Sequence, residues 1–179
     1  MADTPTVDAG MSSAEYLALA ARGVLAEAEV ELIDGLVFSM TPLSDEHAAV
    51  IQRMTGLLAT GRGDLHVQLP LHLADDSVPE PDLALADRRG HRHPSTARLV
   101  VEVVVSQWDE AMRKLPVYAE AGVAECWIVD VPKRLVHVHD EPSGREFGRT
   151  RTFAGDDALE PPGTELRFTV ADVFTRLDA

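Results

Sequence analysis

The run Leu99–Val105, LVVEVVV, constrains the fold of this chain more than any other segment. Aliphatic and β-branched residues fill it apart from one acid, Glu102, a pattern typical of a strand buried on both faces. A helical pattern follows over 108–121 and stops at Gly122, and CWIVDV at 126–131 predicts a second buried strand. This order of strand, helix and strand predicts a crossover unit inside a mixed sheet.

The other patterns surround this unit with hairpins and short helices. Asp34-Gly35 between two apolar runs is a strong signal for a two-residue hairpin turn. Further helices are predicted over 14–22 and from Ser44 to about Gly61. Strands are predicted at 66–73, 79–86, 134–141 and 143–153, and 164–174 predicts a strand followed by a short helix. We expect an α/β (α+β) fold with a mixed β-sheet flanked by helices, in one domain over 13–179 after a disordered tail, 1–12.

The formal net charge of −14 is unevenly distributed. Residues 1–46 carry nine acids and one base, whereas the segment 88–98 carries no acid and four arginines, Arg88, Arg89, Arg92 and Arg98. An acidic chain is a poor general binder of nucleic acid, because contacts to phosphate need cations. The sequence therefore predicts a basic loop on an acidic body, which is either a phosphate-binding segment or a solvated surface turn.

No apolar run approaches the roughly 18 residues that a membrane span requires. The N-terminal segment MADTPTVDAGMSSAEY lacks the basic flank and the apolar stretch of a signal peptide. The single cysteine, Cys126, has no partner for an internal disulfide. We expect a protein of the reducing cytoplasm.

Two acids stand in positions that call for an explanation. Glu102 has three apolar neighbours on each side, and an unpaired carboxylate there would cost several kcal/mol. It is therefore neutral, paired with a base such as arginine, or bound to a metal. Asp82 begins a predicted strand just after Pro79 and Pro81, where an acid is common. Side by side, the two carboxylates would repel each other unless a hard cation such as Mg²⁺ lay between them.

His137 and His139 alternate along a predicted strand and therefore face the same side of it. Two such histidines could bind zinc, but no third ligand stands at a supporting spacing. A solvated strand face is the preferred interpretation.

At these acids the sequence resembles a known family. The strings PEPDLAL, LVVEVVVS, KLPVYAEAGVAECWIVD, VELIDGLVFSM and PGTELRFTVADVF, with Ser44 three residues before His47, are similar to Uma2-type restriction-endonuclease-like proteins, a branch of the PD-(D/E)XK nuclease superfamily. The similarity runs from about residue 12 to 177. It implies a restriction-endonuclease-like core, in which a mixed sheet is flanked by helices, and Mg²⁺- or Mn²⁺-dependent cleavage of phosphodiester bonds.

The resemblance also implies a set of site residues. Asp82 and Glu102 would be catalytic and bind the metal, and the backbone carbonyl of Val103 would help. The superfamily's lysine would stand two residues after Glu102, where this chain has Val104. In the Uma2-like pattern that lysine moves to the next helix and corresponds to Lys114, which would orient the attacking water or offset charge in the transition state. The alternative for Lys114 is an ordinary exposed helix lysine.

Two further residues correspond to the family pattern. His47 is a candidate for water activation or phosphate contact, and its alternative is a partly buried core histidine. Glu31 is either a third carboxylate near the metal or a surface acid of the hairpin.

Three functions remain open on the sequence. The first is a Mg²⁺-dependent endonuclease that holds DNA with the Arg88–Arg98 loop and forms a homodimer with two sites. The second is a non-catalytic module that keeps the nuclease fold and binds nucleic acid or protein. The third is a metal-dependent hydrolase of small phosphoesters.

Overall fold

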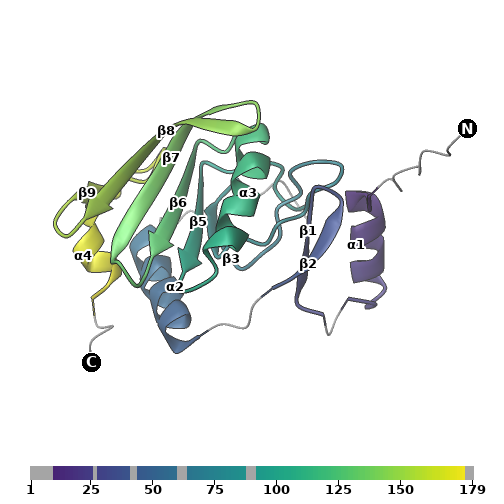
Figure 1. Ribbon diagram of the computed structural model, residues 1–179, viewed down its shortest axis with the longest axis horizontal. Helices are drawn as coiled ribbons and strands as arrows, with labels where there is room; N and C mark the ends of the chain where they lie inside the picture. The colour runs from purple at the N-terminus through teal and green to yellow at the C-terminus, as the bar shows by residue number, and fades with distance from the viewer. Residues whose placement is uncertain (1–9, 26–27, 41–43, 60–63, 88–91, 176–179) are drawn as a thin grey trace, which may run out of the picture.

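The computed structural model describes residues 10–25, 28–40, 44–59, 64–87 and 92–175. Most of the predicted disordered tail lies outside the described residues, as do Arg88 and Arg89 of the predicted basic loop. The described chain folds into a six-stranded sheet with helices on both faces, and a smaller helix and hairpin unit lies beside it (Figure 1).

The central sheet has the strand order β3-β4-β5-β6-β7-β8. Its strands are β3 (Leu65–Val67), β4 (Leu83–Leu85), β5 (Leu99–Val104), β6 (Glu125–Asp130), β7 (Leu135–Ser143) and β8 (Glu146–Ala154). β5 and β6 are parallel, and the other neighbouring pairs of this sheet are antiparallel. Helix α3 (Trp108–Glu120) makes the crossover between β5 and β6, which confirms the mixed sheet and the crossover predicted from the sequence.

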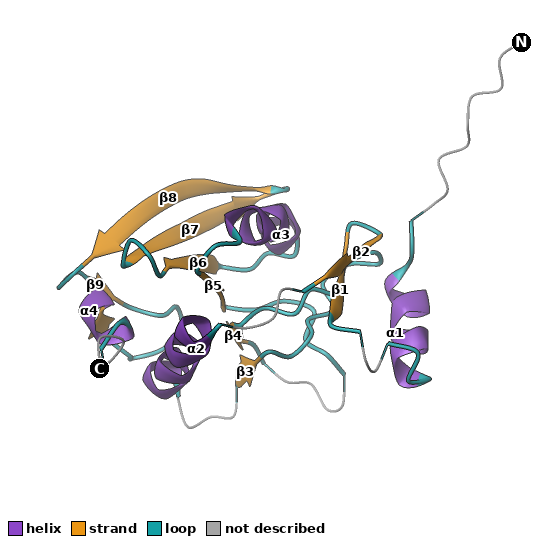
Figure 2. Ribbon diagram, turned by 60° about the horizontal axis from the view of Figure 1, so that its bottom comes forward, coloured by secondary structure: helices purple, strands orange, loops and turns teal. Residues whose placement is uncertain are grey.

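The remaining helices and short strands of the sheet domain are α2 (Asp45–Leu58), β9 (Ala158–Leu159), β10 (Phe168–Thr169) and α4 (Val170–Val173). α2 and α4 cover one face of the sheet, and α3 covers the other (Figure 2). Alternate residues of β5 therefore enter different cores. Val101 and Val103 pack on the α2 side, whereas Val100 and Val104 pack on the α3 side. Glu102 has the parity of Val100 and Val104, so its side chain is directed toward α3.

The smaller unit consists of α1 (Ser13–Ala21) and the hairpin of β1 (Val30–Ile33) and β2 (Leu36–Ser39). Asp34 and Gly35 form its turn with φ values of 48° and 74°, as a two-residue turn with two left-handed residues requires. Tyr16 of α1, Leu32 of β1 and Val78 form a small separate core. A β-bridge between Leu32 and Val78 attaches the hairpin to the segment that leads to Asp82.

The predicted strand over 66–73 is wrong beyond Val67. Gln68 adopts a φ of 47°, in the left-handed region, and breaks the extended conformation directly after β3. Pro70 has no N–H group to continue a ladder. The chain therefore leaves the sheet at Gln68.

The surface interpretation of His139 is also wrong, because this residue is 9% exposed. Its Nδ1 lies 3.0 Å from Oγ1 of Thr150, and His137 Nδ1 lies 3.0 Å from Oγ1 of Thr152. Both histidines pair across the β7–β8 hairpin under aromatic rings, those of Phe147 and Trp108. In the part of the chain that is described, no helix is long and apolar enough to cross a membrane.

Candidate active site

The antiparallel pairing of β4 with β5 brings Asp82 and Glu102 to one place. Leu83 is opposite Val101, so Asp82, directly before β4, lies beside residue 102. Asp82 Oδ2 accepts a hydrogen bond of 2.7 Å from the N–H of Val103. Asp82, Glu102 and Val103 all line one cavity of about 460 Å³ near the carboxyl end of β5.

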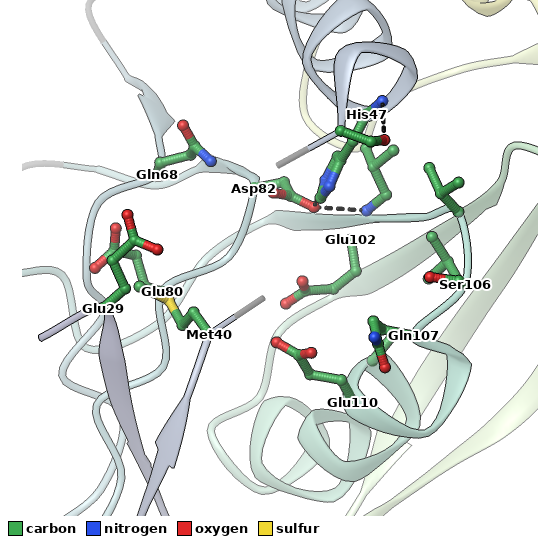
Figure 3. A pocket seen from close by; sticks show the side chains of 15 residues that line it. Glu29, Met40, His47, Gln68, Glu80, Asp82, Glu102, Ser106, Gln107 and Glu110 are labelled. Atoms are coloured by element: carbon green, nitrogen blue, oxygen red, sulfur yellow. Dashed lines mark hydrogen bonds and ion pairs between the residues drawn. The ribbon is translucent and has the colours of Figure 1, made fainter. Parts of the chain in front are cut away.

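This cavity is acidic. Five of its lining residues are acids, and they are Glu29, Glu80, Asp82, Glu102 and Glu110. No lysine or arginine is among the described residues that line it, and its one histidine is His47. The carboxylates of Glu102 and Glu110 point into the same space, opposite Glu29 and Glu80 (Figure 3). An anion that enters this cavity meets several acids and no lysine or arginine among the described residues that line it.

Two side chains of helix α3 contact the carboxyl group of Glu102. The hydroxyl of Tyr118 donates a short hydrogen bond to Glu102 Oε1, and Lys114 Nζ lies 3.3 Å from Glu102 Oε2. Lys114 and Tyr118 are four residues apart, so both project from the same face of the helix. Burial raises the pKa of Glu102 to about 8, although the Lys114 ammonium opposes that rise. The basic partner of Glu102 is therefore a lysine instead of the arginine considered from the sequence, and burial favours the neutral form of this carboxyl group.

Lys114 lies between two carboxylates. Its Nζ is 3.1 Å from Glu31 Oε2 as well as 3.3 Å from Glu102 Oε2, and its side chain is 5% exposed. Burial alone would lower the pKa of Lys114, but the carboxylates of Glu102 and Glu31 outweigh it and hold that pKa above its ordinary value. Lys114 is therefore not an exposed helix lysine. It stands behind Glu102 rather than in the lining of the cavity.

His47 lies at the start of α2, beside Asp82. Ser44 caps this helix, and its Oγ accepts the N–H of His47 at 3.2 Å. The Nε2 of His47 lies 2.9 Å from Asp82 Oδ2. The histidine is thus partly buried and hydrogen-bonded, and it also lines the cavity. Asp82 is held from two sides, by an imidazole and by a backbone N–H.

Glu31 is buried at 2% exposure, so it is not a surface acid of the hairpin. Its Oε2 accepts the N–H of Glu80 at 3.1 Å and contacts Lys114. Burial and the Glu31 carboxylate raise the pKa of Glu80. Glu80 was not predicted as a site residue, although it stands in the same PEPD string as Asp82. Glu29 and Glu110 were also missed, and no local pattern marks them.

The charges of this region fit a bound cation. Three carboxylates, of Glu31, Asp82 and Glu102, are buried in this region, and the ammonium of Lys114 contacts those of Glu31 and Glu102. No group of three or more His, Cys, Asp or Glu side chains in the described part of the chain is arranged to hold a metal ion by itself. Mg²⁺, however, commonly takes only one or two carboxylates and completes its shell with water and phosphate. The carboxylates of Asp82 and Glu102, with the backbone carbonyl of Val103 beside them, match this preference of Mg²⁺ for few protein ligands.

The two described arginines of the predicted basic loop lie away from this cavity. Arg98 donates to Asp64 and, at 3.0 Å, to the carbonyl of Gly163, so it is committed to internal contacts. Arg92 is exposed. Both line a second cavity of about 870 Å³ at the amino end of β5. Arg98 stands four positions before Glu102 along the extended chain, which corresponds to about 13 Å between their Cα atoms.

Comparison with known proteins places these features in context. Residues 13–171 match the sequence profile of the family Uma2, described as "Putative restriction endonuclease". A crystal structure of a "putative nuclease belonging to DUF820" from Anabaena variabilis has a similar fold, with a TM-score of 0.69. The two share 15% sequence identity, and the match covers 83% of this chain and 90% of the other. No curated protein matches the chain.

Proposed function

This chain belongs to the Uma2 family, and on that premise we propose that it is a divalent-metal-dependent endonuclease that hydrolyses phosphodiester bonds of DNA. One observation carries the proposal: Asp82 and Glu102 converge on a cavity whose described lining has five acids and no lysine or arginine. A phosphodiester is an anion and would be repelled by that lining. A divalent cation between the carboxylates of Asp82 and Glu102 would offset the repulsion between the phosphodiester and the acidic lining.

The proposed ligands are the carboxylates of Asp82 and Glu102 and the backbone carbonyl of Val103, with Mg²⁺ or Mn²⁺ as the ion. When bound, the ion would polarise a phosphoryl oxygen and lower the pKa of a coordinated water. The protein's own groups orient the ligands. His47 and the N–H of Val103 fix Asp82, and Tyr118 and Lys114 fix Glu102.

His47 and Lys114 have different proposed roles. His47 lines the cavity, and its Nε2 can hold or pass a proton beside Asp82. Lys114 is buried behind Glu102, so we assign it to the charge and orientation of that carboxylate instead of to direct contact with water. This assignment suits its position on α3 better than the water-orienting role expected from the family pattern.

DNA is the proposed substrate, and the Arg88–Arg98 loop is its proposed contact outside the metal site. Within that loop Arg92 is the described arginine that is exposed and available for phosphate. A homodimer in the cytoplasm, with one site from each subunit, is the assembly we propose. It would bring two basic loops to one duplex, so that local cations face the phosphates although each subunit has a net charge of −14.

Asp82→Ala tests the proposal. We expect wild-type protein to bind Mn²⁺ in calorimetry and to nick plasmid DNA with Mg²⁺ or Mn²⁺ but not with EDTA. Asp82→Ala should lose at least about 100-fold in activity, since it removes one of two metal carboxylates. Asp75→Ala, which changes an exposed acid outside the cavity, should behave as wild type.

Two results would contradict this function. Absence of Mn²⁺ binding by wild-type protein would favour the non-catalytic binding module. Cleavage of small phosphoesters but not of plasmid would favour the third hypothesis from the sequence.

A further inference from the structure

We propose that Glu31 is a positioning residue. Its carboxylate fixes the ammonium of Lys114, which orients Glu102, and the backbone of Glu80, which places Asp82. The inference rests on the proposed function, because it concerns how Asp82 and Glu102 are held for a cation. Of the two roles that the sequence suggested for Glu31, it refines the first, a third carboxylate near the metal, and leaves out the second, a surface acid of the hairpin.

A single oxygen of Glu31 joins three segments of the chain. Glu31 belongs to β1, Lys114 to α3, and Glu80 to the segment before β4. Oε2 of Glu31 receives the Lys114 ammonium at 3.1 Å and the N–H of Glu80 at 3.1 Å. The hairpin is also clamped next to that segment, since the N–H of Val78 donates to the carbonyl of Leu32 at 2.7 Å. The carboxylate therefore lies in a fixed frame.

The contact with Glu80 bears on Asp82. Pro79 and Pro81 flank Glu80, and proline has no backbone N–H. Glu80 thus supplies the one backbone N–H of this tripeptide, and Glu31 accepts it. Prolines restrict the backbone, and this hydrogen bond fixes where the restricted segment lies relative to the hairpin. Asp82 follows Pro81 directly, so its approach to β5 depends on that anchor.

The contact with Lys114 bears on Glu102. Nζ lies at nearly the same distance from both carboxylates, 3.1 Å from Glu31 and 3.3 Å from Glu102. Because Glu31 holds the ammonium from the other side, Nζ has a fixed place beside Glu102 Oε2. Lys114 and Tyr118 together then orient the Glu102 carboxyl group. Without the Glu31 carboxylate the ammonium loses one of its two partners, and the orientation of Glu102 loosens.

Glu31→Gln tests the inference on metal affinity. Glutamine keeps an oxygen that can accept the Glu80 N–H and removes only the charge. We expect the Mn²⁺ affinity to fall by about 10–100-fold, the usual effect of changing a group that orients metal ligands. Asp34→Asn is the matched control, because it makes the same acid-to-amide change on the same hairpin and breaks an exposed ion pair with Arg145. Its Mn²⁺ affinity should equal that of wild type.

A double-mutant cycle tests the coupling without metal. Unfolding by urea in EDTA is compared for Glu31→Gln, Lys114→Met and the double variant. Each single change removes one partner of the Glu31–Lys114 ion pair and leaves the charge of the other less compensated. The double change removes both of these charges, so the double variant should be more stable than additivity predicts. The double variant also keeps the test valid where a single variant folds poorly.

Additive effects in the cycle, or an equal Mn²⁺ affinity for Glu31→Gln and Asp34→Asn, would overturn the positioning role. Failure of the proposed function would give a different set of results from failure of the positioning role. In that case wild-type protein would bind no Mn²⁺, while the cycle in EDTA would still report whether Glu31 and Lys114 are coupled.

Discussion

Tyr118 shows how a single residue can serve both the stability and the chemistry of this protein. Its side chain is completely buried, and its hydroxyl donates to Glu102 Oε1. Burial and the Glu102 carboxylate raise the pKa of Tyr118 well above its ordinary value, so the hydroxyl stays neutral and remains a donor. Tyr118 can therefore donate this hydrogen bond at neutral pH.

We predict that Tyr118→Phe lowers the free energy of unfolding by about 1–3 kcal/mol, because it leaves a buried carboxylate oxygen without its donor. The variant should also lose about 10–100-fold in Mn²⁺ affinity, since Glu102 is no longer fixed. Urea unfolding and calorimetry measure the two effects.

Tyr16→Phe is the matched control for that prediction. Tyr16 also donates a buried hydroxyl, at 2.7 Å to the carbonyl of Val30, but it belongs to the small core of α1 and the hairpin. Removing this neutral hydrogen bond should cost about 1 kcal/mol and leave Mn²⁺ affinity unchanged. Equal Mn²⁺ affinities for the two variants would mean that Tyr118 has only a structural role.

Helix α2 is the element whose start positions a candidate catalytic group. Ser44 caps it by accepting the N–H of His47, and His47 in turn contacts Asp82. We predict that Ser44→Ala lowers the free energy of unfolding by about 0.5–2 kcal/mol and also lowers nuclease activity, because the first turn that carries His47 loosens. Thermal unfolding and the plasmid assay check the two parts.

Helix α1 provides the comparison, because Ser12 caps it in the same way, accepting the N–H of Glu15 at 3.3 Å. Ser12→Ala should lose a similar amount of stability and keep full activity. If both cap variants retained activity in proportion to their folded fraction, the position of His47 would not matter for cleavage.

The elements predicted best from the sequence are those whose signal is local. β5 and β6 consist of apolar residues because both of their faces are buried, and α3 between them has a helical period. The Asp34-Gly35 turn follows from the backbone freedom of these residues at positive φ. The convergence of Asp82 and Glu102 follows from the same local signals, once the one basic loop between them is taken to join neighbouring strands.

The burial of Glu31 and Lys114 could not be predicted in the same way. Lys114 is 83 residues from Glu31, and the ion pair between them compensates part of the cost of burying both charges. Glu31 turns inward because Leu32 and Val78 attach the hairpin to another segment, a tertiary contact that no local pattern encodes. His139 was misplaced for a similar reason, since its partner Thr150 lies on the next strand.

At the scale of the whole molecule, the described side chains separate charge along β5. The acidic cavity lies near the carboxyl end of the strand, and the cavity with Arg92 lies at its amino end. Under the proposed function, a polyanion would approach one end through an arginine of the protein and the other end through a bound metal ion. This separation would allow a chain with a net charge of −14 to bind the proposed nucleic-acid substrate.

Arg92 provides the last prediction, because an exposed arginine that contacts phosphate acts through charge alone. In EDTA, where no cleavage occurs, Arg92→Ala should weaken DNA binding for all sequences equally. It should also reduce the slope of log Kobs against log salt by about 0.9, the contribution of one released counterion. Arg167→Ala, an exposed arginine that lines neither cavity, should leave the slope unchanged. Identical slopes for the two variants and wild type would place the DNA elsewhere on the surface, because a lost phosphate contact cannot leave counterion release unaffected.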